Sequence, residues 1–310
     1  VRPPTLQMGQ HSPRAEAIPQ SSLKGKNMIT FDELNIGYLP SGRLWKGFAP
    51  PTSFGPLGTT TISQSGNPSF GFYDNFHSFQ ASTLEGPYRI LEGTGCTIEQ
   101  IADTSTEKGL VQLAVDGNAA NDEAVLQWGR GLGAPFLLAN NDLVFECRLN
   151  VSAITAAKHS WAVGLANVAA GATDGLFVDT TGILATAASF CGFAHLSAEG
   201  ADVDGAFKAA SQTYQDGATK TKLNALATMV ASTYVKLGFR YRAAPKTVEY
   251  FVNGVLAGTG SAPARLTSSE INAATFPDDV LLAPIIGIKD IAGDAALNLK
   301  VDWIACAQML

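Results

Sequence analysis

Two strands and a tight turn can be read in Lys236-Leu237-Gly238-Phe239-Arg240-Tyr241-Arg242 and Thr247-Val248-Glu249-Tyr250-Phe251-Val252-Asn253-Gly254-Val255-Leu256. Asn and Gly both tolerate positive φ, so Asn253-Gly254 predicts a two-residue turn that matches the right-handed twist of a hairpin. A further strand, Leu297-Asn298-Leu299-Lys300-Val301-Asp302-Trp303-Ile304, alternates strictly. These segments indicate an antiparallel β-sandwich, which specifies a shape without supplying any chemistry.

Strand-like runs separated by turn residues recur from Phe70 onward, with no alternating helices. In the run 143–151, Val144, Glu146, Arg148 and Asn150 share one face, while the other face is apolar. We count at least ten strands, which predicts an all-β fold of two packed antiparallel sheets, a jelly-roll-like sandwich. Two segments stay ambiguous: 218–231 reads as a helix or as a strand with its loop, and 267–274 reads as one capped helical turn.

The composition fits many short strands and turns. Of the 310 residues, 46% are hydrophobic and only 15% are charged, and glycine is abundant. No stretch approaches the apolar length of a membrane helix, and the first residues carry no apolar signal-peptide region. Cys96, Cys147, Cys191 and Cys306 are far apart and lack metal-ligand spacing, so we expect buried free thiols, with one disulfide as the alternative.

The chain divides near residue 68 into an N-terminal arm, 1–68, and a β-sandwich domain, 69–310. Nine of the fifteen prolines lie in the arm, which has a net charge of +3, whereas the remainder has a net charge of −9. The arm also carries more large apolar groups than a disordered linker needs. We expect it either to pack on its own domain or to order against a neighbouring subunit, and the partner-binding candidates are Phe31, Tyr38, Arg43, Trp45, Lys46, Phe48 and Phe54.

The order of these pieces resembles the concanavalin A-like lectin/glucanase sandwich. The matching segments are 143–149, 160–165, 235–240, 248–254 and 301–304. More narrowly, Asp74-Asn75-Phe76 and the closing segment from Val301 to Gln308 look like structural proteins of tailed bacteriophages. The resemblance covers about residues 70–310 and excludes the proline-rich arm.

This resemblance implies a non-enzymatic virion protein, made in the bacterial host cytoplasm and located on the capsid surface. It implies a decoration or cement protein that binds the major capsid protein, bridges neighbouring subunits and forms a homo-oligomer, with a trimer favoured. The alternative is a lectin-like, carbohydrate-binding virion module for attachment to host glycans. A third reading, glycoside hydrolase, is suggested by the enzymes that share the fold.

The residues do not favour catalysis. A retaining glycosidase needs two carboxyl groups about 5–5.5 Å apart, and no strand shows the Glu-x-Asp-x-x-Glu pattern of the hydrolases. Asp202 and Asp204 are suitably spaced but stand between glycines, which predicts a loop, and Asp278-Asp279 predicts a turn. No Gly-x-Ser-x-Gly elbow accompanies the histidines, and we expect His77 and His195 to be packed residues.

Cofactor and ligand signals are weak. No cofactor is predicted, although Asp116, Asn118, Asn121 and Asp122, or Asp202 with Asp204, have the oxygen groups that calcium prefers. Trp161 and Trp303 lie in apolar strands and are expected in the core. The acidic body without clustered lysine or arginine excludes a nucleic-acid partner, and no membrane partner is expected.

Overall fold

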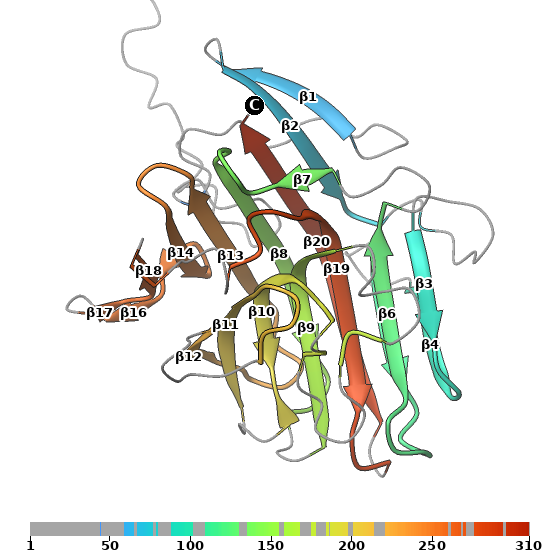
Figure 1. Ribbon diagram of the computed structural model, residues 1–310. Helices are drawn as coiled ribbons and strands as arrows, with labels where there is room; N and C mark the ends of the chain where they lie inside the picture. The colour runs from blue at the N-terminus through green and yellow to red at the C-terminus, as the bar shows by residue number, and fades with distance from the viewer. Residues whose placement is uncertain are drawn as a thin grey trace, which may run out of the picture.

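The computed structural model is an all-β molecule of two layers (Figure 1). It describes residues 44, 59–64, 67–76, 79, 88–101, 109–129, 135–154, 158–167, 175–177, 184–185, 187–197, 201–213, 221–259, 262–267, 269–270, 276–293 and 296–309, with the backbone alone for 59–64, 67–70, 259 and 262.

The larger layer, sheet A, is antiparallel and has ten strands. Its main path runs in the order β1 (Thr59–Gln64), β2 (Asn67–Asp74), β20 (Leu297–Met309), β8 (Leu143–Val151), β13 (Val235–Arg242), β14 (Thr247–Val252) and β15 (Val255–Leu256). A branch leaves β20 through β5 (Leu110–Val115) to β4 (Cys96–Ile101), and β18 (Arg265–Leu266) pairs with β14. The strand β20 therefore lies in the middle of sheet A, between β2 and β8.

The second layer, sheet B, has eight antiparallel strands. Its order is β12 (Lys222–Thr228), β11 (Asp202–Lys208), β10 (Phe190–His195), β9 (His159–Asn167), β19 (Leu281–Asp290), β6 (Glu123–Trp128) and β3 (Tyr88–Glu92), with β7 (Phe136–Leu137) paired to β19. A separate two-stranded ribbon joins β16 (Gly258–Thr259) and β17 (Ala262–Pro263). The predicted all-β antiparallel sandwich is confirmed.

The core lies between the inner faces of the two sheets. On β8 the inner face is the apolar set that alternation predicted: Leu143, Phe145, Cys147, Leu149 and Val151. Trp161, Val163 and Leu165 on β9 face them from sheet B. Alternation predicted this inner face correctly because the period of a strand is two, so one face of β8 is wholly apolar, while Val144 lies on the outer face with the polar residues.

The predicted Asn-Gly turn is confirmed. Asn253 and Gly254 connect β14 to β15 with φ values of 50° and 77°, so both central residues have the positive φ of a type I′ turn. The side chain of Asn253 also accepts a hydrogen bond from the amide of Lys236 on β13, at 2.9 Å. The same residue therefore makes the turn and fastens it to the neighbouring strand.

The structure bears on the two segments that the sequence left ambiguous, 218–231 and 267–274, and on the loop predicted for Asp202 and Asp204. Within 218–231 the chain forms the strand β12, not a helix. At the predicted cap, the Glu270 carboxylate accepts hydrogen bonds from the backbone amide and the hydroxyl of Thr267, while residues 271–275 lie outside the described part. Asp202 and Asp204 were expected in a loop, and this was wrong: both lie on β11.

The structure also bears on the arm and the thiols. The strand β1 and the start of β2 lie within the segment 1–68, so the sheet begins before the expected domain boundary. All four cysteines are buried free thiols, as predicted. No helix among the described residues is long and apolar enough to span a membrane.

Candidate functional site

The predicted partner-binding residues of the arm lie outside the described residues. These are Phe31, Tyr38, Arg43, Trp45, Lys46, Phe48 and Phe54. Their neighbour Leu44 is described, and it is fully buried on the outer face of sheet A. At this position the arm packs on its own domain, which is one of the two arrangements expected from the sequence.

Leu44 fits a notch over Gly238 on β13. A Cβ added to Gly238 would fall on the Cδ2 atom of Leu44 and would also lie 2.9 Å from the carbonyl oxygen of Phe145. The rest of the cluster around Leu44 is apolar and comes from β2, β8, β14 and β20: Tyr73, Val144, Phe251, Trp303, Ala305 and Ala307. Trp303, expected in the core, is buried but lies in this cluster and not between the sheets.

Beside this cluster, the outer face of sheet A carries ion pairs between side chains of the protein itself. Arg240 and Arg265 both contact the Glu249 carboxylate, with Arg240 Nη2 at 2.6 Å from Oε2. Burial raises the pKa of Glu249, but the hydrogen bonds and charges of the two arginines outweigh it and lower the pKa overall. Further along, Arg148 pairs with Asp302 at 2.6 Å and lies over the ring of Tyr234, 3.9 Å from its centroid.

The outer face of sheet B is covered in a different way. The chain between β9 and β10 crosses this face, and we call its described residues 175–177, 184, 185, 187 and 188 the strap. Leu176, Phe177, Leu184, Ala185 and Ala188 of the strap form an apolar cluster with the strands beneath. The strands supply a flat floor of small residues, which are Ala162, Ala166, Ala194, Ala206 and Gly287.

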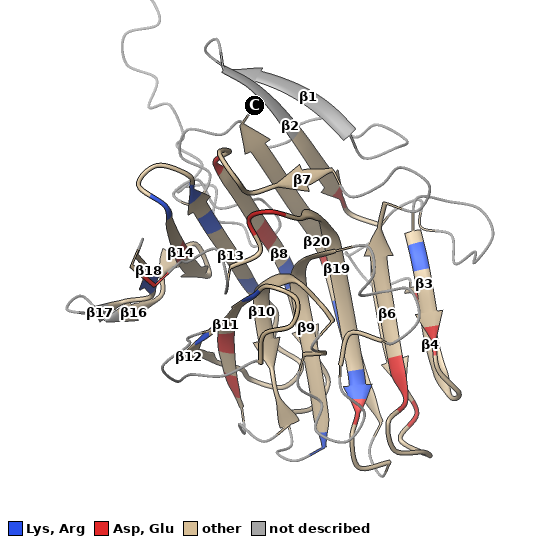
Figure 2. Ribbon diagram, in the orientation of Figure 1, with Lys and Arg blue, Asp and Glu red and all other residues tan. Residues whose placement is uncertain are grey.

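Two buried charged residues hold the strap in place. The Glu123 carboxylate at the start of β6 accepts hydrogen bonds from the amides of Leu176 and Phe177, and it pairs with Lys289 at 3.3 Å. In Figure 2 the acidic end of β6 lies beside the basic end of β19. Burial raises the pKa of Glu123, and the amide of Leu176 and the charge of Lys289 oppose that rise.

At the other end of the strap, Lys208 on β11 donates from Nζ to the carbonyl oxygens of Ala185 and Ala188. The lysine is fully buried, and burial lowers its pKa to about 8. Amphipathic periodicity does not predict this arrangement, because a lysine on a strand is expected to reach solvent.

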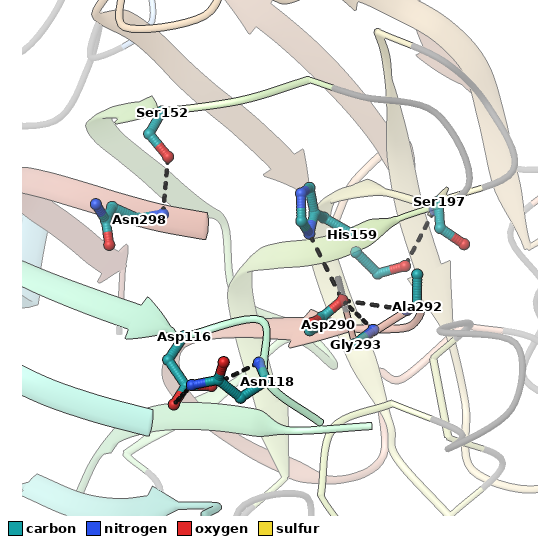
Figure 3. A network of polar contacts seen from close by, with 10 residues as sticks. Asp116, Asn118, Ser152, His159, Ser197, Asp290, Ala292, Gly293 and Asn298 are labelled. Carbon is teal, nitrogen blue, oxygen red and sulfur yellow. Dashed lines mark hydrogen bonds and ion pairs between the residues drawn. The ribbon is translucent and has the colours of Figure 1, made fainter. Parts of the chain in front are cut away.

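The residues considered for calcium already have partners within the protein. Asn118 donates from its amide and its side chain to the Asp116 carboxylate, at 2.9 and 2.7 Å (Figure 3), and these hydrogen bonds lower the pKa of Asp116. Asp204 pairs with Lys222 at 3.0 Å and accepts the amide of Ala225. Among the residues that the structure describes, no group of three or more potential ligands is arranged to hold a metal ion.

A polar network that the sequence did not reveal lies at one end of sheet B (Figure 3). His159 Nδ1 is 4.0 Å from Asp290 Oδ1, and that carboxylate oxygen also accepts the amides of Ala292 and Gly293. The neighbouring Ser160 hydroxyl accepts the amide of Ser197 at 3.1 Å. His159 and Asp290 are almost fully buried, so this network joins the ends of β9 and β19 and is closed to a substrate.

Of the two histidines that were predicted to be packed, the structure describes only one. His195 is a packed strand residue, as expected: it stacks on Trp161 with ring centroids 5.8 Å apart, and its Nδ1 lies 2.8 Å from the carbonyl oxygen of Asp202. Burial lowers its pKa. His77 lies outside the described residues.

Comparison with known proteins gives fold likeness only. No family model and no curated protein sequence matches the chain. Among solved structures, a protein of unknown function from Shewanella oneidensis MR-1 matches with 16% identity and a TM-score of 0.50, over 84% of this chain and 97% of that one. An endo-1,3-β-glucanase from Streptomyces sioyaensis matches with 12% identity and a TM-score of 0.49, over 83% and 99%.

A carbohydrate esterase from the Shiga toxin-encoding bacteriophage phi24B matches with 19% identity and a TM-score of 0.44, over 81% of this chain and 99% of that one. The likeness to the Shewanella protein is a likeness of fold alone, and it agrees with the two-layer sandwich described above.

Proposed function

We propose that this chain is a non-enzymatic structural protein of a bacteriophage virion. It decorates the capsid, binds the major capsid protein on the exterior and bridges neighbouring subunits. The observation that carries this proposal is that the chain packs against both outer faces of its own sandwich, with Leu44 on sheet A and the strap on sheet B. Contacts with other molecules then fall to the sheet edges and to the segment before Leu44.

The charges of the described residues support a role in adhesion. Carboxylates that could act as acid or base are held in internal ion pairs: Glu249 with Arg240, Asp204 with Lys222, and Glu123 with Lys289. For Glu249 the two arginines lower the pKa, so this carboxylate is a poor proton donor near neutral pH.

The net positive charge of residues 1–68 complements an acidic protein surface. A shell protein held in this way is stabilised by many moderate contacts that add up over the particle.

The position of Leu44 shows where the arm can be truncated without uncovering the notch at Gly238. A variant lacking residues 1–40 keeps Leu44 in the Gly238 notch, so it retains the packing on the outer face of sheet A. We expect this variant to fold with an unchanged thermal transition but to lose binding to capsids assembled without the chain. The matched control is the full chain added to the same capsids.

Occupancy is measured by sedimentation of the capsids and by electron microscopy of the particles. Full occupancy by the shortened chain would refute a role for residues 1–40, which include Phe31 and Tyr38, and would leave capsid binding to the arm residues that this variant keeps, from Arg43 to Phe54.

A glycan array on the same two proteins separates this proposal from the lectin-like alternative. Trp128, Trp161 and Trp303 are all buried, so none of the described tryptophans presents a face for a sugar to stack on. We expect no reproducible hit. A sugar bound near micromolar affinity by both proteins would favour the carbohydrate-binding module.

A further inference from the structure

The described sheet edges differ in how well they are protected against pairing with another chain. An exposed edge strand presents unpaired amides and carbonyls, and proteins blunt such edges with charges, bulges, short strands or side-chain caps. The edge of sheet A formed by β15 and β18 consists of strands of two residues each. The edge strand β4 contains Glu99, and its Ile98 amide donates to the Glu92 side chain at 2.7 Å.

The edges of sheet B are protected as well. The register between β11 and β12 shifts between Val203 and Gly205, and Ala225 on β12 has a φ of 51°, which breaks the regular strand. The edge strand β3 has five residues, and Arg89 and Glu92 place charges of both signs on it.

The strand β1 has none of these protections. Its sequence, Thr-Thr-Thr-Ile-Ser-Gln, contains no charged residue, no proline and no glycine, and threonine and isoleucine favour extended backbone. All six residues are in regular register with β2, from Thr59 opposite Phe72 to Gln64 opposite Asn67. No described strand pairs with the other side of β1, which is the outermost strand of sheet A in Figure 1.

We propose that β1 is a self-association edge, to which a second copy of this chain adds its own β1 in antiparallel pairing. Two A sheets then form one continuous sheet across a twofold axis. A twofold contact makes the same strand serve on both sides, and an uncharged strand can face its own copy without like-charge repulsion. A second copy is thus the occupant that β1 fits best.

The outward backbone groups of β1 specify the register. The amide of Met309 donates toward β8, so alternation through β20 and β2 leaves the amides and carbonyls of Thr59, Thr61 and Ser63 on the free side of β1. Opposed residues in an antiparallel pair must both direct these groups at each other, so the twofold axis passes through Thr61. Thr61 then lies opposite Thr61 of the second copy, Thr59 opposite Ser63, and Thr60 opposite Ile62. Paired hydroxyl-bearing residues and β-branched residues are favourable cross-strand neighbours. This register uses every backbone group on the free side of β1.

A contact of five residues per chain is small beside the area of a stable protein interface, so the pair dissociates readily in dilute solution. Weak pairing suits a protein that is concentrated on a surface, where each added contact acts at high effective concentration. The inference rests on the proposed function only for the capsid surface on which the chains are concentrated. The pairing of β1 with a second β1 is a property of the free chain and can be tested without capsids. It yields a dimer, which differs from the trimer implied by the resemblance.

The first experiment measures the oligomeric state of the full chain by sedimentation velocity over a series from low micromolar to near-millimolar concentration, without capsids. We expect a monomer at the lowest concentration and a dimer that grows in as the concentration rises. A chain that stays monomeric throughout overturns the proposal, whether or not it binds capsids. Capsid binding without self-association would leave the proposed function intact.

The second experiment tests the register by charge reversal. Thr59→Lys with Ser63→Lys places like charges opposite each other twice and should abolish the dimer, as should Thr59→Glu with Ser63→Glu. An equal mixture of the two variants should restore a heterodimer. The matched control, Val230→Lys with Leu281→Lys, adds two lysines at exposed positions away from β1 and should dimerise as the native chain does.

The third experiment separates backbone pairing from side-chain contact. Thr60→Pro and Thr61→Pro remove the amides of adjacent residues, which point to opposite sides of the strand. The substitution that removes the outward amide leaves thermal unfolding unchanged and should abolish the dimer. If that thermally unaltered variant, or both charge variants, still dimerised like the native chain, β1 would not be the contact.

Discussion

The outer faces of sheet A and sheet B are covered in different ways. On sheet A, ion pairs such as Arg240 with Glu249 lie flat over the strands, and the apolar part closes around Leu44. On sheet B, an apolar strap covers a floor of alanine and glycine, and the charges of Glu123 and Lys208 are used to hold the strap. Sheet A is thus covered by side chains, and sheet B by a length of main chain that two buried charges hold, so the two faces should respond to different perturbations.

The largest expected effect is on sheet B, where Glu123→Ala removes the carboxylate that holds the strap. Lys289 would be left as a buried cation without this partner, and the amides of Leu176 and Phe177 would lose their acceptor. Breaking a buried pair from one side costs about 3–5 kcal/mol. Urea unfolding should show this loss in the free energy of unfolding.

The double variant Glu123→Leu with Lys289→Met is the control for that prediction, because replacing both partners by apolar groups avoids the uncompensated charge. We expect it to recover part of the loss but not all of it, since the two strap amides remain without their acceptor. A single variant as stable as the native chain would show that Glu123 does not hold the strap.

On sheet A, Leu44→Ala should cost about 2–5 kcal/mol, the range for truncating a buried leucine. Gly238→Ala should also destabilise the protein, because its methyl group would fall on Leu44. Combining the two substitutions removes that clash, so the double variant should lose less than the sum of the two single losses. Strict additivity in a double-mutant cycle by urea unfolding would mean that Leu44 does not occupy the notch.

A pH titration gives a smaller effect, at Lys208 on the strap. Its pKa of about 8 in the folded protein lies below the ordinary value of 10.5, so between these values the unfolded chain binds more protons. Stability therefore rises with pH across this window, by at most about 1.4 kcal/mol per pH unit. The difference in unfolding free energy between the native chain and Lys208→Met isolates this slope from the buried cysteines. A difference that does not change from pH 8 to 10.5 would contradict the assignment.

The smallest effect is expected at Glu249 on sheet A. Its pKa is lowered in the folded protein, so the stabilisation from ionised Glu249 is complete above the ordinary value of 4.5 and is lost as the pH falls through the lower folded value. Because Arg265 is substantially exposed and screened by water, we expect about 1 kcal/mol between the native chain and Glu249→Gln at neutral pH. The two proteins should converge in acid, and added salt should narrow the gap at neutral pH.

The inner faces could be predicted from the sequence, whereas the outer faces could not. Alternation on β8 assigns Phe145 and Leu149 to the core, and Asn253-Gly254 is a local turn signal that needs no tertiary context. Arg148 and Glu146 on the opposite face of β8 are expected at the surface, yet they are buried by contacts from distant segments. Such burial depends on what covers the sheet, and periodicity carries no information about that.

The failures at β11 and the strap have physical causes. Asp202 and Asp204 have low strand propensity, but Lys222 and the amide of Ala225 satisfy the Asp204 carboxylate across the strand pair. The strap is rich in alanine and shows neither strand nor helix periodicity. Its position is explained by the small-residue floor beneath it and by the hydrogen bonds of Glu123 and Lys208, which all come from distant strands. The burial of Leu44 could not be predicted for a similar reason, because the notch that it fills exists only where Gly238 has no side chain.

The central place of β20 in sheet A constrains how the protein is made. Residues 297–309 separate β2 from β8, which are encoded much earlier, and Ser69 pairs with Met309. A growing chain on the ribosome can pair β2 with β1 and β8 with β13, but one edge of β2 and one edge of β8 must stay open until residues 297–309 have been synthesised. During that wait the open strands are exposed to aggregation, so chaperone dependence during synthesis should be pronounced. A product shortened within 297–309 should be recognised by proteases, because its larger layer is split in two.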